Sequence, residues 1–172
     1  MSPRDLVRPE TWPWVALLAS AALLAGAHAF EAAGYAPCSL CLRQREAHWA
    51  IVGISAATIV AGLLRPSLRG WRPAVWLIAV AFLVSAGVAA YHAGVEWKWW
   101  PGPSTCAAGP VGPLAVEDLS AVLSGEKAVR PPACDEAAWT MLGISMAGWN
   151  ALISLALAAL SVVAARSAYR GR

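Results

Sequence analysis

Two pairs of cysteines are the residues of this chain best suited to chemistry. Cys38 and Cys41 form a Cys-x-x-Cys motif, while Cys106 and Cys134 lie much further apart in a later segment. The thiolate is the reactive form of cysteine, and it is favoured at the amino end of a helix or beside a cation. Pro37 precedes the motif and an apolar segment follows it, so we expect Cys41 in the first turn of a helix. The pattern predicts a reactive dithiol.

An arginine beside this motif indicates the same chemistry. Arg45 follows Cys41 by one helical turn and therefore lies on the same face, whereas Arg43 points almost the opposite way. A guanidinium near apolar surroundings is costly unless it has a partner, and that partner is usually functional. We expect Arg45 to favour a thiolate at Cys41 and to stabilise negative charge that develops on a nearby acceptor.

The chain as a whole has the composition of an integral membrane protein. Its 172 residues are 59% hydrophobic and 13% charged, and the net charge of +3 is too small to indicate a nucleic-acid partner. A span requires about 20 apolar residues, and its backbone groups must be satisfied internally, so each span should be a helix. The sequence predicts an all-α membrane protein, a four-helix transmembrane bundle forming a single domain over residues 1–172, with spans at 14–30, 47–64, 74–91 and 142–165.

The distribution of arginine predicts the orientation. The arginines outside the cysteine-bearing connections are Arg4, Arg8, Arg65, Arg69, Arg72, Arg166, Arg170 and Arg172. The connections at 31–46 and 96–141 are acidic or mixed in charge and hold all the cysteines. Under the positive-inside rule, both termini are expected in the cytoplasm and both cysteine pairs in the periplasm of a bacterial inner-membrane protein. A cleavable signal peptide ending near Ala27-His28-Ala29 is an alternative for the first span, and it leaves the cysteines outside.

The long outer connection holds the second cysteine pair. Its residues 113–123 have helical periodicity, which predicts a short amphipathic helix lying on the membrane or against the loop itself. A static bridge between Cys106 and Cys134 would be worth roughly 3–4 kcal/mol. In an oxidising compartment, exchange between two pairs on one face is the better explanation. The Cys-x-x-Cys motif could be half of a metal site, but the sequence offers no matching half, so no metal is predicted.

Electrons taken from thiols at a membrane need an acceptor. The membrane location suggests a lipid-soluble quinone, with Cys41 at the lipid boundary able to react with its ring. His92, near the outer end of the third span, could hydrogen-bond a ring oxygen, or it could be an ordinary helix-end histidine with local partners.

At these residues the chain resembles the disulfide bond formation protein B (DsbB) family, membrane quinone reductases that reoxidise a periplasmic thioredoxin-fold oxidase. The resemblance implies a disulfide-generating oxidoreductase whose partners are a periplasmic thioredoxin-fold dithiol oxidase (DsbA-like) and ubiquinone or menaquinone in the bilayer. The segments that carry it are Pro37 to Cys41 with Gln44-Arg45, Tyr91-His92 ahead of Trp100 to Cys106, and Cys134 followed by Trp139, Leu142-Gly143 and Met146 to Trp149.

The resemblance also implies a role for each site residue. Cys106 would be attacked by the reduced partner, and its mate Cys134 would pass oxidation from the pair formed by Cys38 and Cys41. Cys41 would face the quinone. Gln44 is given no role, because some members carry an acid at that position. The quinone-binding residues that the resemblance implies are Arg45, His92 and Met146.

Other functions remain open at this stage. A haem-binding, quinol-oxidising membrane subunit would use His28 and His92 as axial ligands near the outer leaflet. A vitamin K epoxide reductase-like protein would share the thiol chemistry, but the position of the second cysteine pair after the third span argues against it. A membrane scaffold with a structural loop bridge would not need the Cys-x-x-Cys motif.

Overall fold

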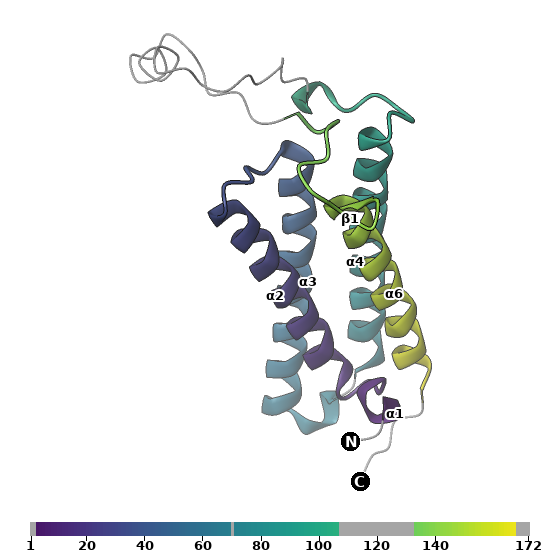
Figure 1. Cartoon of the computed structure of the whole chain (residues 1–172). Coiled ribbons are helices and arrows are strands. Elements are labelled where there is room, and N and C mark those ends of the chain that lie inside the picture. The colour runs from purple at the N-terminus through teal and green to yellow at the C-terminus, as the bar shows by residue number, and fades with distance from the viewer. Residues whose placement is uncertain (1–2, 70, 107–132, 168–172) are drawn as a thin grey trace, which may run out of the picture.

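The computed structural model describes residues 3–69, 71–106 and 133–167, and these ranges are almost entirely helical (Figure 1). A short helix, α1 (Pro3–Leu6), precedes four long ones, α2 (Trp12–Ala32), α3 (Ser39–Leu64), α4 (Arg72–Glu96) and α6 (Met146–Arg166). The other described elements are two 3-10 helices, η1 (Pro66–Leu68) and η2 (Ser104–Cys106), and an antiparallel hairpin of β1 (Thr140–Met141) and β2 (Ile144–Ser145).

All four long helices are long and apolar enough to cross a membrane. The predicted spans at 14–30, 47–64 and 74–91 lie within α2, α3 and α4, and the span at 142–165 covers nearly all of α6. The prediction of an all-α, four-helix membrane fold is therefore confirmed. The amphipathic helix expected at 113–123 lies outside the described residues.

Helix α3 begins at Ser39, well before the expected span start at residue 47. The predicted span counted only the apolar residues that follow the charged side chains of this stretch, although a helix was expected to begin near Cys41. The helix continues through these charged side chains because each arginine there has an acidic partner: Arg43 pairs with Glu46, and Arg45 pairs with Glu31. The predicted outer connection at 31–46 is thus helical over its second half.

Helix α6 begins at Met146, because the apolar residues before it form a turn. Leu142 and Gly143 have positive φ angles of 54° and 77° and connect β1 to β2. Glycine adopts this conformation without steric cost. Ser145 then caps α6, since its Oγ accepts a hydrogen bond from the Gly148 N–H at 3.1 Å.

The four long helices pack in the spatial order α2, α3, α4, α6, and α2 makes little contact with α6. Near α1, Trp12 Nε1 on α2 donates to Ser161 Oγ on α6 at 2.8 Å. The apolar core there contains Trp12, Ile51 and Phe82, none more than 1% exposed. Toward the other end of the bundle, α2 leans away from α6 (Figure 1).

Candidate redox site

The two predicted cysteine pairs meet in one buried cluster, where the start of α3 lies beside the end of α4. Cys106 and Cys134 form a disulfide with a Cα–Cα distance of 5.2 Å. Cys38 and Cys41 are thiols whose sulfur atoms are 2.8 Å apart. The structure therefore holds an oxidised loop pair against a reduced Cys-x-x-Cys pair.

Cys38 is the N-cap residue of α3. Its backbone is extended (φ −78°, ψ 173°), and its Sγ accepts a hydrogen bond from the Cys41 N–H at 3.2 Å. Cys41 lies in the first helical turn, as predicted. The pKa of Cys38 is raised, because its hydrogen bond with Cys41 Sγ keeps the proton on Cys38 and because burial disfavours the charged form. When the pair loses one proton, the negative charge therefore falls on Cys41.

The chain after α4 folds back over that helix and so brings Cys106 to Cys38. The Trp100 ring stacks on Tyr91 with ring centroids 5.8 Å apart, and its Nε1 donates to the Tyr91 carbonyl at 3.0 Å. Gly94 makes room for this ring, since a Cβ at that position would overlap it. The packing of Trp100 on Tyr91 and Gly94 thus holds the chain against α4 just before Cys106.

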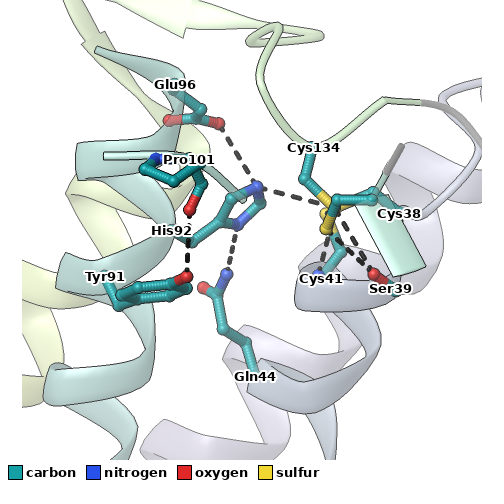
Figure 2. The surroundings of a disulfide bond; sticks show 10 residues. Cys38, Ser39, Cys41, Gln44, Tyr91, His92, Glu96, Pro101 and Cys134 are labelled. Atoms are coloured by element: carbon teal, nitrogen blue, oxygen red, sulfur yellow. Dashed lines mark hydrogen bonds and ion pairs between the residues drawn. A yellow bond between two sulfur atoms is a disulfide. The ribbon is translucent and has the colours of Figure 1, made fainter. Parts of the chain in front are cut away.

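A serine hydroxyl links the two cysteine pairs. Ser39 Oγ lies 3.1 Å from Cys106 Sγ and 3.4 Å from Cys134 Sγ (Figure 2). Disulfide sulfurs carry no hydrogen, so the serine O–H is the donor. Because Ser39 directly follows Cys38, this hydroxyl holds the loop disulfide beside the Cys-x-x-Cys motif.

His92 is buried beside Cys38, with 3% of the residue exposed. Its Nδ1 lies 2.7 Å from Gln44 Nε2, and its Nε2 lies 3.6 Å from Cys38 Sγ and 3.8 Å from Glu96 Oε1 (Figure 2). The sequence analysis gave Gln44 no role and expected nothing of Glu96. Helical spacing offered a signal for both, since each lies one turn from a predicted site residue, Cys41 or His92.

Arg45 lies beside the same cavity as Cys41, and its guanidinium has partners on α2. It pairs with Glu31, and its Nη2 donates to the Ala27 carbonyl at 3.0 Å. Its side chain is 13% exposed, whereas that of Arg43, on another face of α3, is 70% exposed. Arg45 thus joins α3 to α2 next to the thiols.

A cavity of about 280 Å³ adjoins the two thiols. Its largely apolar walls come from α2, α3, α4, α6 and the segment before β1, so it lies where α2 and α6 diverge. The rings of Phe30 and Trp139, which also line it, pack edge to face with centroids 5.3 Å apart. Since an apolar cavity of about 150 Å³ holds benzene, there is room for a substituted ring. The predicted residues that line the cavity are Cys38, Cys41, Arg45, His92 and Met146.

His48 and Asn150 also line this cavity, and the sequence analysis missed both. His48 is 3% exposed, and its Nε2 lies 2.9 Å from Asn150 Oδ1. Asn150 Nδ2 in turn donates to Gln44 Oε1 at 2.6 Å. His48 follows Gln44 by one helical turn, so periodicity from the cysteine motif could have found it. Asn150 lies on a different helix, and no local pattern marks it.

The histidines proposed as a haem pair belong to separate environments. The His28 side chain is 54% exposed, and its Nδ1 lies 3.5 Å from Glu31 Oε2 on the same helix. His92 is buried, and it contacts the side chains of Gln44, Cys38 and Glu96 and the backbone of Cys134.

The donor atoms of Cys38, Cys41 and His92 all lie within 4.8 Å of one another. Such donors can bind zinc, but Zn–S bonds of about 2.3 Å in a tetrahedron place two thiolates about 3.8 Å apart. The two sulfurs here are 2.8 Å apart, a spacing closer to a disulfide than to a metal site. That the chain holds no metal stays a prediction.

Known proteins resemble the chain over most of its length. A family model described as "Disulfide bond formation protein DsbB" matches residues 9–164. The Disulfide bond formation protein B of Aromatoleum aromaticum is 30% identical over 152 residues, which cover 85% of this chain and 84% of the relative. That of Stutzerimonas stutzeri is 30% identical over 153 residues (86% and 88%), and that of an Azoarcus species is 33% identical over 142 residues (81% of each). No solved structure matches the chain at a significant level.

Proposed function

The chain belongs to the disulfide bond formation protein B family and is a disulfide-generating, multi-pass membrane oxidoreductase; we propose that it reoxidises a periplasmic thioredoxin-fold dithiol oxidase (DsbA-like) and passes the electrons to a membrane quinone. The family predicted from the sequence is confirmed. The haem-binding and vitamin K epoxide reductase-like alternatives find no support in the family match.

One observation carries the proposal: an unbroken path of contacts runs from the loop disulfide to the cavity. Ser39 Oγ touches both sulfurs of the Cys106–Cys134 bond. Cys38 packs against that bond in the same buried cluster, and Cys38 and Cys41 both line the cavity. Thiol–disulfide exchange requires only that a thiolate reach a disulfide sulfur, so this arrangement supports a relay of electron pairs.

In the proposed relay, the loop pair exchanges first with the partner. A thiolate of the reduced partner attacks Cys106 Sγ, and the Cys106–Cys134 bond breaks with Cys134 leaving as a thiolate. Cys134 then attacks Cys38 in an oxidised Cys38–Cys41 bond, and Cys41 leaves as a thiolate. The partner's second thiol closes its own disulfide and releases Cys106 as a thiolate. Cys106 then attacks Cys134 in the Cys134–Cys38 bond, which re-forms the Cys106–Cys134 bond and releases Cys38 as a thiolate. Two electrons and two protons have then moved to Cys38 and Cys41, the redox state of the structure described above.

The second half of the cycle reoxidises the Cys-x-x-Cys pair. A quinone supplies an acceptor of two electrons and two protons and departs as quinol. The apolar cavity beside Cys41 fits such a ring, and Met146 contributes to its wall. Arg45 would supply positive charge near a ring oxygen, and His92 lines the same cavity beside Cys38. Loss of the electron pair forms the Cys38–Cys41 bond and prepares the chain for another exchange.

We propose that the cysteine end faces the periplasm and that both termini are cytoplasmic. The arginines of the α3–α4 connection and the end of α6 support this, because they lie away from the cysteines. Arg72 Nε, for instance, donates to the Ala165 carbonyl at 2.8 Å. Positive charge marks the cytoplasmic side of bacterial inner-membrane proteins. Labelling of the thiols by a membrane-impermeant maleimide in intact spheroplasts, after reduction, would test this orientation.

The proposed activity can be measured with the full chain in lipid nanodiscs, a reduced thioredoxin-fold oxidase and a short-chain ubiquinone or menaquinone. We expect partner disulfide and quinol to appear in equal amounts, and turnover to stop without quinone. Cys41→Ser should abolish quinol formation. Turnover without quinone under anaerobic conditions, or unchanged turnover in Cys41→Ser, would overturn the proposal.

A further inference from the structure

A chain of buried polar side chains runs from His92 into the apolar interior of the bundle. His92 contacts Gln44, Gln44 contacts Asn150, and Asn150 contacts His48. His48 also approaches two hydroxyls, with its Nδ1 3.4 Å from Ser20 Oγ and its Nε2 3.3 Å from Ser85 Oγ. Polar groups inside a membrane are rare, because each needs a hydrogen-bond partner there. Those that are present are usually functional.

The hydrogen bonds in this chain have a fixed direction. Asn150 Nδ2 donates to Gln44 Oε1 at 2.6 Å, which leaves Gln44 Nε2 to face His92 Nδ1 at 2.7 Å. A side-chain amide nitrogen only donates, so His92 Nδ1 must be the ring nitrogen without a proton. A neutral His92 therefore carries its proton on Nε2.

The other side of the ring supports the same assignment. His92 Nε2 faces Glu96 Oε1 at 3.8 Å and Cys38 Sγ at 3.6 Å. An ionised Glu96 only accepts, so a proton on Nε2 is favourable there and a lone pair is not. Turning both amides would place the lone pair of Nε2 against Glu96. At the far end, Asn150 Oδ1 receives donors from His48 Nε2 at 2.9 Å and Ser154 Oγ at 3.3 Å, as the same direction requires.

We propose that His48, Asn150 and Gln44 are positioning residues that fix the proton of His92 on Nε2, where it is donated toward Cys38 Sγ. The consequence for catalysis rests on the proposed function. When Cys38 gives up its proton during reoxidation, the Nε2–H donates to the thiolate and stabilises it until the Cys38–Cys41 bond forms. With the proton on Nδ1, His92 would offer that thiolate a lone pair.

The assignment can be read directly by nitrogen NMR on the full chain, with histidine labelled by ¹⁵N, in nanodiscs without quinone or partner. The chain has three histidines, and the His92 signals are assigned as those that disappear in a His92→Gln variant, with His28→Ala identifying a second set. We expect His92 to show an unprotonated Nδ1 and a protonated Nε2. A proton on Nδ1 in the unsubstituted chain would overturn the proposal, whatever the enzyme's activity proves to be.

A variant then shows whether the tautomer of His92 is set by the hydrogen bonds from Asn150 and Gln44 or by the neighbouring Glu96 alone. Asn150→Leu removes the donor that orients Gln44, so the His92 signals should move toward a mixture of the two tautomers. Ser161→Ala, on the same helix but in the core at the other end, should leave them unchanged. Reoxidation of the Cys-x-x-Cys pair by quinone should slow on the order of tenfold in Asn150→Leu, as for a weakened hydrogen bond to a charged group. Unchanged His92 signals in Asn150→Leu would refute the positioning role.

Discussion

The two ends of the bundle are built from the same four helices but differ in what joins α2 to α6. Near α1, Trp12 lies between them, fully buried, and its indole donates to Ser161. At the cysteine end, no such direct bond is found among the described residues, and α2 is tied to α3 through Arg45 and Glu31 instead. The cavity lies on this side.

This difference shows how stability and chemistry are separated along the helix axes. The Trp12 end holds a close-packed core of large apolar and small residues. The cysteine end keeps an opening between α2 and α6, and polar side chains of α3, α4 and α6 form hydrogen bonds beside it. We expect substitutions at the first end to change folding and those at the second to change turnover.

The largest effect is expected from removing the indole at the packed end. Trp12→Ala should lower the free energy of unfolding by about 3–5 kcal/mol, the usual cost of truncating a buried tryptophan. Reversible unfolding in mixed micelles would measure it, and turnover per folded molecule should stay unchanged. Trp49→Ala, which removes a ring that is 56% exposed, is the matched control and should change stability little. A loss of turnover in folded Trp12→Ala would contradict the view that the Trp12 end serves stability alone.

The next effect concerns affinity at the cavity. Arg45→Met removes the guanidinium that lines it, and the apparent KM for quinone should rise about tenfold or more, as for loss of a charge-assisted hydrogen bond. Steady-state turnover at varied quinone concentration would show it. Arg43→Met, which removes the same charge from an exposed face two residues away, should leave the KM unchanged. Equal effects in the two variants would mean that Arg45 acts only through general surface charge.

A smaller effect should follow loss of the hydroxyl between the cysteine pairs. Ser39→Ala removes the donor to both loop sulfurs, so the departing thiolate loses one hydrogen bond, and exchange should slow by about five- to tenfold. Rapid-quench measurement of exchange with reduced partner isolates this step from quinone reduction. Ser39→Thr keeps the hydroxyl and should restore the rate. Failure of threonine to restore it would indicate that serine serves only the start of α3.

How far the sequence could predict this site depends on the range of each contact. The positions of Cys41 and Arg45 follow from helical spacing along one segment, and the structure agrees with both. The contact of Gln44 with Asn150 joins two helices far apart in the sequence, and its formation depends on how each helix is rotated in the bundle. A single sequence does not show how each helix is rotated about its own axis relative to its neighbours. The turn at Leu142 was likewise hidden, because an apolar run looks the same in a turn as in a span.

The smallest expected effect lies in the segment that carries Cys134. The neighbouring Asp135 forms an ion pair with Lys98 at the end of α4, and the hydrogen bond from Lys98 holds the pKa of Asp135 below its ordinary value. A carboxylate with a lowered pKa stabilises the folded segment above its unfolded pKa, and that contribution is lost as pH falls through the folded pKa. The contact should therefore be constant at neutral pH and weaken only below about pH 4.

Hydrogen exchange of the backbone amides of residues 133–139 would report this contact, because the ion pair holds that segment to α4. Exchange rates, corrected for intrinsic pH dependence, should rise below about pH 4 in the unsubstituted chain. Asp135→Asn should raise them slightly at neutral pH and remove the acid-dependent rise, whereas Glu136→Gln, which removes the same charge one residue later, should keep it. If both variants kept the rise, another group would hold the loop in place. The cysteine end would then be fastened by its disulfide and its aromatic packing, with the surface ion pair contributing nothing, as many exposed pairs do.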